Sequence, residues 1–190
     1  MAVSKLNPVA AGITVSDGNS AGWGSTEPQW TSIATSTTTG ASVTFSGISG
    51  YRYLRLYIRD YVSGTSTTPR VQVNSTTTGY SLLQHAFRDN ASNILVTNYG
   101  DSDAHYIAYY TATSSYNHNG GFVDFYNVNT SLPYKEIEGH FGSINGSSGE
   151  AHCMSRGTWK NTSAITSITV TLYSTSFATN SGGLALYGAN

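Results

Sequence analysis

Alternation of apolar and hydroxyl side chains is the strongest pattern in this sequence, and it is clearest in the last quarter of the chain. Ile168, Val170 and Leu172 alternate with serine and threonine, and two leucines within residues 184–187 repeat the pattern. Successive side chains of a β-strand point to opposite faces, so a two-residue period predicts a strand with one buried face. We expect residues 165–173 and 184–187 to form a β-hairpin that closes the domain.

The same alternation continues through most of the chain upstream. In residues 51–59 three apolar side chains alternate with tyrosine and arginine. Leu54, Leu56 and Ile58 should therefore be buried, while the aromatic and cationic face meets solvent or another subunit. Residues 37–40 are a polar turn ending in glycine, which predicts a hairpin between the two strands that flank it. The expected strands are 30–36, 41–45, 51–59, 70–73, 80–87, 94–99, 104–111, 122–128, 134–144, 151–159, 165–173 and 184–187.

Composition limits the fold class. Only 10% of the 190 residues are charged, against roughly 25% in an average soluble domain. The chain nevertheless contains 14 Tyr, 6 Phe and 3 Trp, and aromatic side chains at this density bury enough area for a folded core. No window shows the apolar spacing of a helix. We therefore predict an all-β fold, a two-sheet β-sandwich of jelly-roll-like type over residues 30–190.

Residues 1–29 differ from the rest of the chain. They contain Asn-Pro, Asp-Gly and Gly-Trp-Gly sequences and no regular alternation, which is typical of an extended segment with turns. We expect this segment to be an extended N-terminal arm that anchors the domain to a neighbouring subunit. The apolar side chains expected to make that contact are Leu6, Val9, Ile13, Val15 and Trp23.

Charge and hydropathy argue against several kinds of partner. The net charge is −1 and the chain has three lysines, so it lacks the positive field that nucleic-acid binding requires. No apolar run approaches the roughly 20 residues that cross a bilayer, and we expect no membrane partner. The single cysteine, Cys153, leaves no partner for a disulfide or a cysteine-rich metal site. We expect no cofactor.

Two short motifs fit catalytic chemistry by spacing alone. Ser20 lies in a Gly-x-Ser-x-Gly sequence, but it lacks the preceding apolar strand and following helix of a nucleophile elbow. Glu136 and Glu138 lie on one face of an expected strand, roughly 7 Å apart, which suits a carboxylate pair for glycoside cleavage. Lys135 beside them favours a solvent-facing strand instead. We predict no catalytic site and no enzymatic activity.

The sequence also lacks a pattern for metal binding. Residues 100–103, Gly-Asp-Ser-Asp, bring two carboxylates together, but a strand pattern follows in place of the remaining ligands of a calcium loop, so we expect a solvated turn. The five histidines never show the i, i+2 or i, i+4 spacing that points two imidazoles at one metal. We predict no metal site. The histidines are His85, His105, His118, His140 and His152.

One cluster fits carbohydrate binding without catalysis. Four tyrosines precede an Asn-His-Asn sequence, and sugars stack on aromatic faces while amides hydrogen bond to their hydroxyls. Tyrosine is also common in cores and subunit interfaces, and that interpretation is the stronger of the two. The candidate glycan-binding residues are Tyr106, Tyr109, Tyr110, Tyr116 and His118.

Several segments resemble a diffuse family of bacteriophage virion proteins. Residues 45–54 are similar to the pattern F-x-x-I-x-x-Y-x-x-L of that family, and a strand ending in Asn74 follows. Residues 164–169, A-I-T-S-I-T, and a closing L-Y-G are similar to the end of such chains. The resemblance extends from about Trp30 to Gly188. It implies a β-domain of the tail-fibre or capsid-surface type, and it assigns no catalytic residue.

The resemblance implies a non-enzymatic structural protein at the surface of a phage particle. A compact head with an anchoring arm fits a capsid decoration or cement protein, because the chain has no heptad or β-helix repeats for a fibre shaft. The alternatives are a short tail-fibre or tail-tip protein that binds host glycans, and a lectin-like module. Expected partners are other capsid or tail subunits and further copies of the chain, as a trimer, because so few surface charges insulate a monomer poorly.

Overall fold

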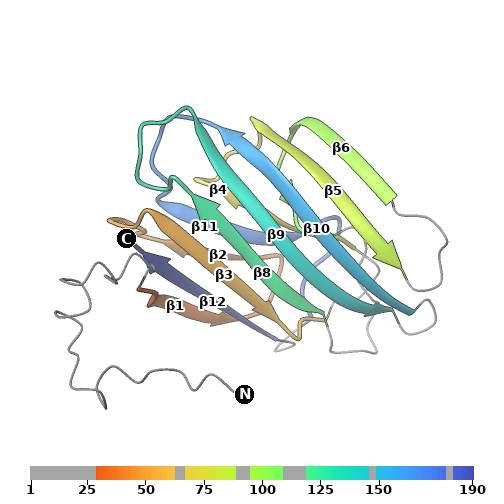
Figure 1. Ribbon diagram of the computed structural model, residues 1–190. Helices are drawn as coiled ribbons and strands as arrows, with labels where there is room; N and C mark the ends of the chain where they lie inside the picture. The colour runs from red at the N-terminus through yellow and green to blue at the C-terminus, as the bar shows by residue number, and fades with distance from the viewer. Residues whose placement is uncertain (1–28, 63–66, 89–94, 109–118, 146–148, 179–181) are drawn as a thin grey trace, which may run out of the picture.

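Every regular element in the described part of the chain is a β-strand. The computed structural model describes residues 29–62, 67–88, 95–108, 119–145, 149–178 and 182–190. Within these ranges an eight-stranded and a four-stranded antiparallel sheet pack face to face around one apolar core (Figure 1). The prediction of an all-β, two-sheet sandwich is confirmed.

The strands lie close to the predicted segments, except that the strand expected over 104–111 is limited in the described residues to two residues. In spatial order, the large sheet consists of β1 (Thr31–Thr37), β12 (Gly183–Ala189), β3 (Tyr53–Arg59), β8 (Gly120–Tyr126), β9 (Tyr134–Asn145), β10 (Gly149–Lys160), β5 (Tyr80–Arg88) and β6 (Leu95–Ser102). The small sheet consists of β2 (Ser42–Ser46), β11 (Ser167–Leu172), β4 (Pro69–Val73) and β7 (His105–Tyr106).

The strand order is that of a jelly roll. One half of the large sheet runs β1-β12-β3-β8, and the small sheet runs β2-β11-β4-β7. Consequently β1 pairs with β12, β2 with β11, β3 with β8 and β4 with β7. These four pairs result when one long antiparallel hairpin is rolled up so that successive strands alternate between two sheets. The jelly-roll part of the prediction is confirmed by this connectivity.

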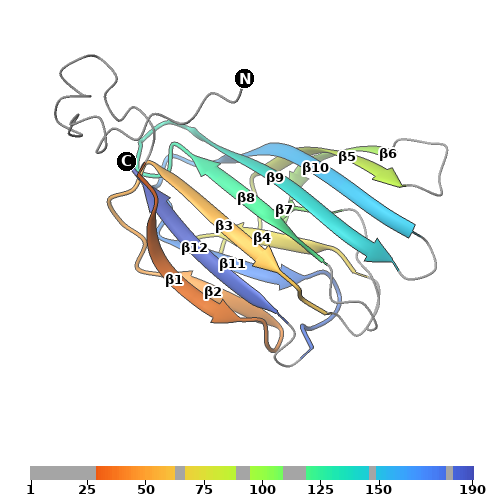
Figure 2. The same cartoon turned by 60° about the horizontal axis from the view of Figure 1, so that its bottom comes forward.

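Four additional strands widen the large sheet. The pair β9 and β10, with twelve residues in each strand, is inserted between β8 and β11 of the jelly roll. The pair β5 and β6 is inserted between β4 and β7. Because β9 pairs with β8 and β10 pairs with β5, both insertions extend the sheet beyond β8. Figure 2 shows this extension at the opposite end of the sheet from β1.

Alternation along the strands determines which side chains fill the interior. Leu54, Leu56 and Ile58 of β3 are at most 1% exposed, as predicted. In β11, Ile168 and Val170 are fully buried and belong to the same apolar core between the sheets. Burying an aliphatic side chain of this size stabilises the folded state by about 1.5–3 kcal/mol. These apolar faces therefore hold the two sheets together.

The predicted hairpin between residues 30–36 and 41–45 is wrong. β1 pairs with β12 in the large sheet, whereas β2 pairs with β11 in the small sheet. The turn between them crosses from one sheet to the other, with Gly40 at a φ of 66°, a conformation that glycine adopts without strain. A polar turn with glycine indicates a change of direction, but it does not determine which strand lies beside the next one.

The predicted C-terminal hairpin is wrong for the same reason. β11 lies between β2 and β4, and β12 lies between β1 and β3 in the other sheet. The segment that joins them runs alongside the β1–β2 crossing: the Phe177 amide donates to the Gly40 carbonyl at 2.9 Å, and the Thr38 amide donates to the Gly182 carbonyl at 3.1 Å. The two crossings therefore support each other at one end of the sandwich.

We expected Lys135 to lie on a solvent-facing strand, but this prediction is wrong. The side chain of Lys135 is fully buried. Its Nζ donates to the carbonyl oxygens of Thr130 at 2.7 Å and Leu132 at 2.9 Å. Burial lowers the pKa of this ammonium. The adjacent Glu136 and Glu138 occupy the opposite, half-exposed face of β9. Lys135 thus fastens the β8–β9 connection from within.

Truncation of the core should destabilise the sandwich strongly. Leu56→Ala and Ile168→Ala should each lower the free energy of unfolding by about 2–5 kcal/mol, because each leaves a cavity in a fully buried strand position. Leu132→Ala, at a loop position that is 52% exposed, should change it by less than about 0.5 kcal/mol. Urea denaturation measures all three variants. A cost as small at Leu56 and Ile168 as at Leu132 would contradict the proposed core.

Candidate functional site

The eight-stranded sheet has a face that points away from the small sheet, and Figure 1 views the molecule from this side. We call it the outer face. Nine large hydrophobic side chains are exposed in the described part of the chain, and seven of them belong to this face. Such a concentration is more typical of a contact surface than of scattered exposure. The seven are Trp30, Tyr57, Leu83, Phe87, Val96, Tyr134 and Met154.

An ion pair surrounded by aromatic rings lies on the β3–β8 part of the outer face. Arg55 donates through Nε and Nη2 to the two carboxylate oxygens of Asp124, each at 2.6 Å. The guanidinium carbon also lies 4.6 Å from the ring centre of Phe122 and 5.3 Å from that of Trp30. Hydrogen bonding to Asp124 raises the pKa of Arg55. This arginine is therefore a fixed, paired cation within an aromatic cluster.

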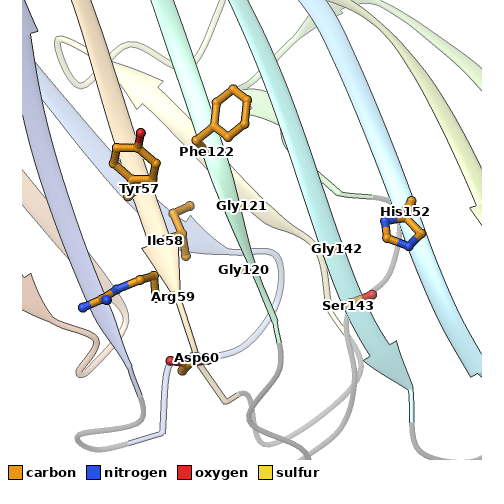
Figure 3. Close-up of a pocket in the computed structure, with 10 residues that line it drawn as sticks. All are labelled: Tyr57, Ile58, Arg59, Asp60, Gly120, Gly121, Phe122, Gly142, Ser143 and His152. Atoms are coloured by element: carbon orange, nitrogen blue, oxygen red, sulfur yellow. The ribbon is translucent and has the colours of Figure 1, made fainter. Parts of the chain in front are cut away.

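A hollow crosses the outer face beside this cluster. Gly120 of β8 pairs with Gly142 of β9, which in turn pairs with His152 of β10. Because neither glycine has a side chain, a cavity of about 560 Å³ opens along this row, from the Asp60 end of β3 to His152 (Figure 3). We call it the glycine trough. The ring of Tyr57 stands along one side of it.

A second hollow lies on the other side of Tyr57. It has a volume of about 580 Å³ and is bordered by Trp30 and Tyr187 as well as Tyr57. The rings of Tyr57 and Tyr187 meet edge to face, with centroids 5.7 Å apart. Arg59 borders both hollows. Tyr57 is therefore the partition between two concave parts of the outer face.

The inserted strands form the apolar end of the outer face. We give this name to Leu83 and Phe87 of β5, Val96 of β6 and Met154 of β10, which are between 41% and 54% exposed. Cross-strand pairing places Phe87 opposite His152, and Met154 opposite His85. The apolar end therefore combines aliphatic and aromatic groups with imidazoles, and the charge beside it, Arg156 opposite Leu83, is paired with Glu136.

The candidate glycan-binding residues do not lie on the outer face where the structure describes them. Tyr106 belongs to β7 of the small sheet, and its hydroxyl donates to the Asp103 carboxylate at 2.9 Å. Arg70 donates to the same carboxylate at 2.6 Å and lies over the rings of Tyr106 and Tyr173. Tyr106 is thus held in a polar network within its own chain. Outside the described residues lie Tyr109, Tyr110, Tyr116 and His118.

The acidic residues singled out in the sequence have partners nearby. Glu136 accepts a hydrogen bond from Arg156 Nε at 2.6 Å, and Glu138 lies 3.4 Å from His140 Nε2. The turn expected at residues 100–103 is wrong in part, because β6 continues to Ser102. In the ranges that the structure describes, no group of three histidine, cysteine or acidic side chains is arranged to hold a metal ion.

A histidine and a serine meet inside the core. His105 Nε2 lies 3.0 Å from Ser155 Oγ, a distance that would suit a base and a nucleophile. Both residues are at most 2% exposed, so the pair is enclosed between β7 and β10. Gln84 strengthens the same junction, because its Nε2 donates to the Tyr106 carbonyl at 2.8 Å. These buried polar contacts fasten β7 to the large sheet.

Sequence reasoning missed the glycine trough, and its prediction of an anchoring N-terminal arm stays a prediction. Gly120 and Gly142 lie at outward positions of their strands, but only the β8–β9 register places them side by side. Ser20 and the expected anchoring residues of the arm lie outside the described residues; the latter are Leu6, Val9, Ile13, Val15 and Trp23.

Comparisons of the chain with protein-family models, with curated proteins and with solved structures found no match. A search of the described residues also found no helix with the length and apolar character needed to cross a membrane.

Stability should depend on pH through His105. Burial lowers its pKa to about 3 from an ordinary 6.5, so the unfolded chain takes up a proton between these values while the folded chain does not. Stability present above pH 6.5 should be lost as the pH falls, by up to about 1.4 kcal/mol per pH unit. His105→Gln should lose less stability than the wild type between pH 7 and pH 4.5 in urea denaturation. Equal losses in both proteins would contradict this assignment.

Proposed function

We propose that the protein is a non-enzymatic structural component of a bacteriophage virion, placed at the particle surface as a capsid decoration or cement protein. Its jelly-roll connectivity is an architecture that viral capsid and lectin domains use. A fold is compatible with many functions, so this support is an analogy. The resemblance of residues 45–54 and 164–188 to phage virion proteins points in the same direction.

The outer face is the observation that carries the proposal. Seven exposed large hydrophobic side chains gather there, whereas the charged groups at its centre, Arg55 and Asp124, neutralise each other. Subunit interfaces combine aromatic side chains, methionine and arginine in this way and contain few free charges. A particle surface supplies the neighbouring subunits that would cover part of such a face, its apolar end above all. We place the expected arm, residues 1–29, as the second attachment point.

Copy number tests the proposed position in the particle. Quantitative mass spectrometry of purified particles that encode this chain should find it in numbers comparable to the major capsid protein. A few copies per particle would identify the alternative, a short tail-fibre or tail-tip protein. Complete absence from purified particles would contradict a virion role and favour a free lectin-like module.

We further propose that the apolar end joins copies of the chain into a homo-oligomer, a trimer. Leu83, Phe87, Val96 and Met154 form its exposed surface on neighbouring strands. In a chain with 10% charged residues, few charges oppose association at this patch, and Arg156 beside it is paired with Glu136. A closed ring of three copies would cover the patch on every subunit.

The mass of the protein in solution checks the oligomer. Light scattering at micromolar concentration should give three times the chain mass of 20.2 kDa. Met154→Glu should shift the mass to that of a monomer, because a carboxylate would be desolvated in the interface. Ser49→Glu, at an exposed loop position, should leave the oligomer intact. A monomeric wild type, or an unchanged oligomer in Met154→Glu, would contradict the proposed interface.

A further inference from the structure

We propose that the glycine trough is a binding site for a neutral oligosaccharide. The site shares no residue with the apolar end, which it meets where His152 lies opposite Phe87, and it is remote from the Tyr106 cluster of the small sheet. Three features support the proposal: the shape of the trough, the rings along one side of it, and a carboxylate at one end that the described residues leave without a partner. The proposal goes beyond the structural role and does not depend on it.

The floor of the trough is a stretch of bare backbone. Gly120 and Gly142 face each other across β8 and β9, and His152 follows on β10. A Cβ built on Gly142 would come no closer than 3.7 Å to another atom, the Nδ1 of His152. Glycine at residue 142 is therefore not required by packing, and its absent side chain leaves the trough open. From β3 to β10 the trough spans three strand spacings, about 14 Å.

A row of rings forms one side of the trough. The rings of Tyr57 and Phe122 have centroids 6.3 Å apart. His140 stacks on the other side of Phe122, with centroids 5.0 Å apart and an interplanar angle of 21°. Tyr57 is 37% exposed, and its ring rises from the sheet beside the trough (Figure 3). His140 and the guanidinium of Arg55 pack on the faces of Phe122, so Tyr57 supplies the stacking surface. The C–H bonds of a pyranose ring carry partial positive charge and pack favourably on the negative face of such a ring.

The ends of the trough supply polar groups for hydroxyls. Asp60 is exposed, and the described residues offer its carboxylate no hydrogen bond or ion pair. Its backbone is left-handed, with a φ of 52°, which aspartate tolerates better than most residues. A carboxylate accepts hydrogen bonds from two neighbouring hydroxyls at once, and the imidazole of His152 adds a polar group at the other end. Figure 3 shows these two residues at opposite ends of the glycine row.

Other classes of ligand fit the trough less well. A peptide that binds by adding a strand needs a free sheet edge, but β3, β8, β9 and β10 all have neighbours on both sides. A nucleic acid would meet a chain of net charge −1, and in the trough the cation of Arg59 is balanced by the carboxylate of Asp60. A neutral ligand with one apolar face and many hydroxyls satisfies the rings and the end groups together.

Binding to defined sugars tests the proposal. The wild-type protein is applied to an array of bacterial and animal oligosaccharides that includes maltotriose and chitotriose, and the strongest ligand is titrated by calorimetry. Gly142→Val fills the trough at a strand position that has room for a side chain, and it should weaken binding at least tenfold. Asp60→Gly removes the carboxylate without strain at positive φ, and it should weaken binding by a similar factor.

Gly100→Val is the matched control. Gly100 lies on β6 of the same sheet, far from the trough, with no atom within 4 Å of a built Cβ. It should bind as the wild type does. Binding by the wild type that both Gly142→Val and Asp60→Gly retain would overturn the proposal, as would a wild type that binds no sugar on the array. Asp60→Gly keeps the test decisive if Gly142→Val does not fold.

Discussion

The apolar interface between the two sheets is the constraint on which the rest of this structure depends. Each strand of the jelly roll has one face for that interface, and Leu56 of β3 and Ile168 of β11 show how completely it is filled. Because these strands bury one face only, their other faces must be acceptable to solvent or to a partner. In a chain with few charges, hydroxyl groups and aromatic rings fulfil that role. The outer face, with its rings around Arg55, is the consequence.

Local pattern was sufficient to predict the strands and their buried faces. The alternation at Leu54, Leu56 and Ile58 specifies which side chains point inward, because it reflects the strand itself. It does not specify the partner strand. For that reason both predicted hairpins failed: the turn at Gly40 and the segment before β12 each cross between the sheets. In a jelly roll, strands adjacent in sequence are often placed in different sheets, and no local signal reports it.

The candidate site was harder to predict than the fold, again because it depends on register. Gly120 and Gly142 are ordinary glycines in sequence, and they form a trough only because β8 and β9 pair as they do. Lys135 shows the same limit. A lysine beside acidic residues predicts an exposed strand. The alternation that exposes Glu136 and Glu138 instead turns Lys135 inward, where backbone carbonyls of the β8–β9 connection accept its hydrogen bonds.

The inserted strands give the outer face both of its distinctive regions. In the eight-stranded jelly roll alone, β8 would be the edge of its sheet, with unpaired backbone groups open to further strands. The β9–β10 pair covers that edge and adds Gly142 and His152. The trough therefore lies where the jelly roll meets the inserted strands. The β5–β6 pair then adds Leu83, Phe87 and Val96, which make most of the apolar end. The trough lies over the central strands β3, β8, β9 and β10 of the large sheet, whereas the apolar end reaches the edge strand β6. A ligand can therefore occupy the first while another subunit covers the second.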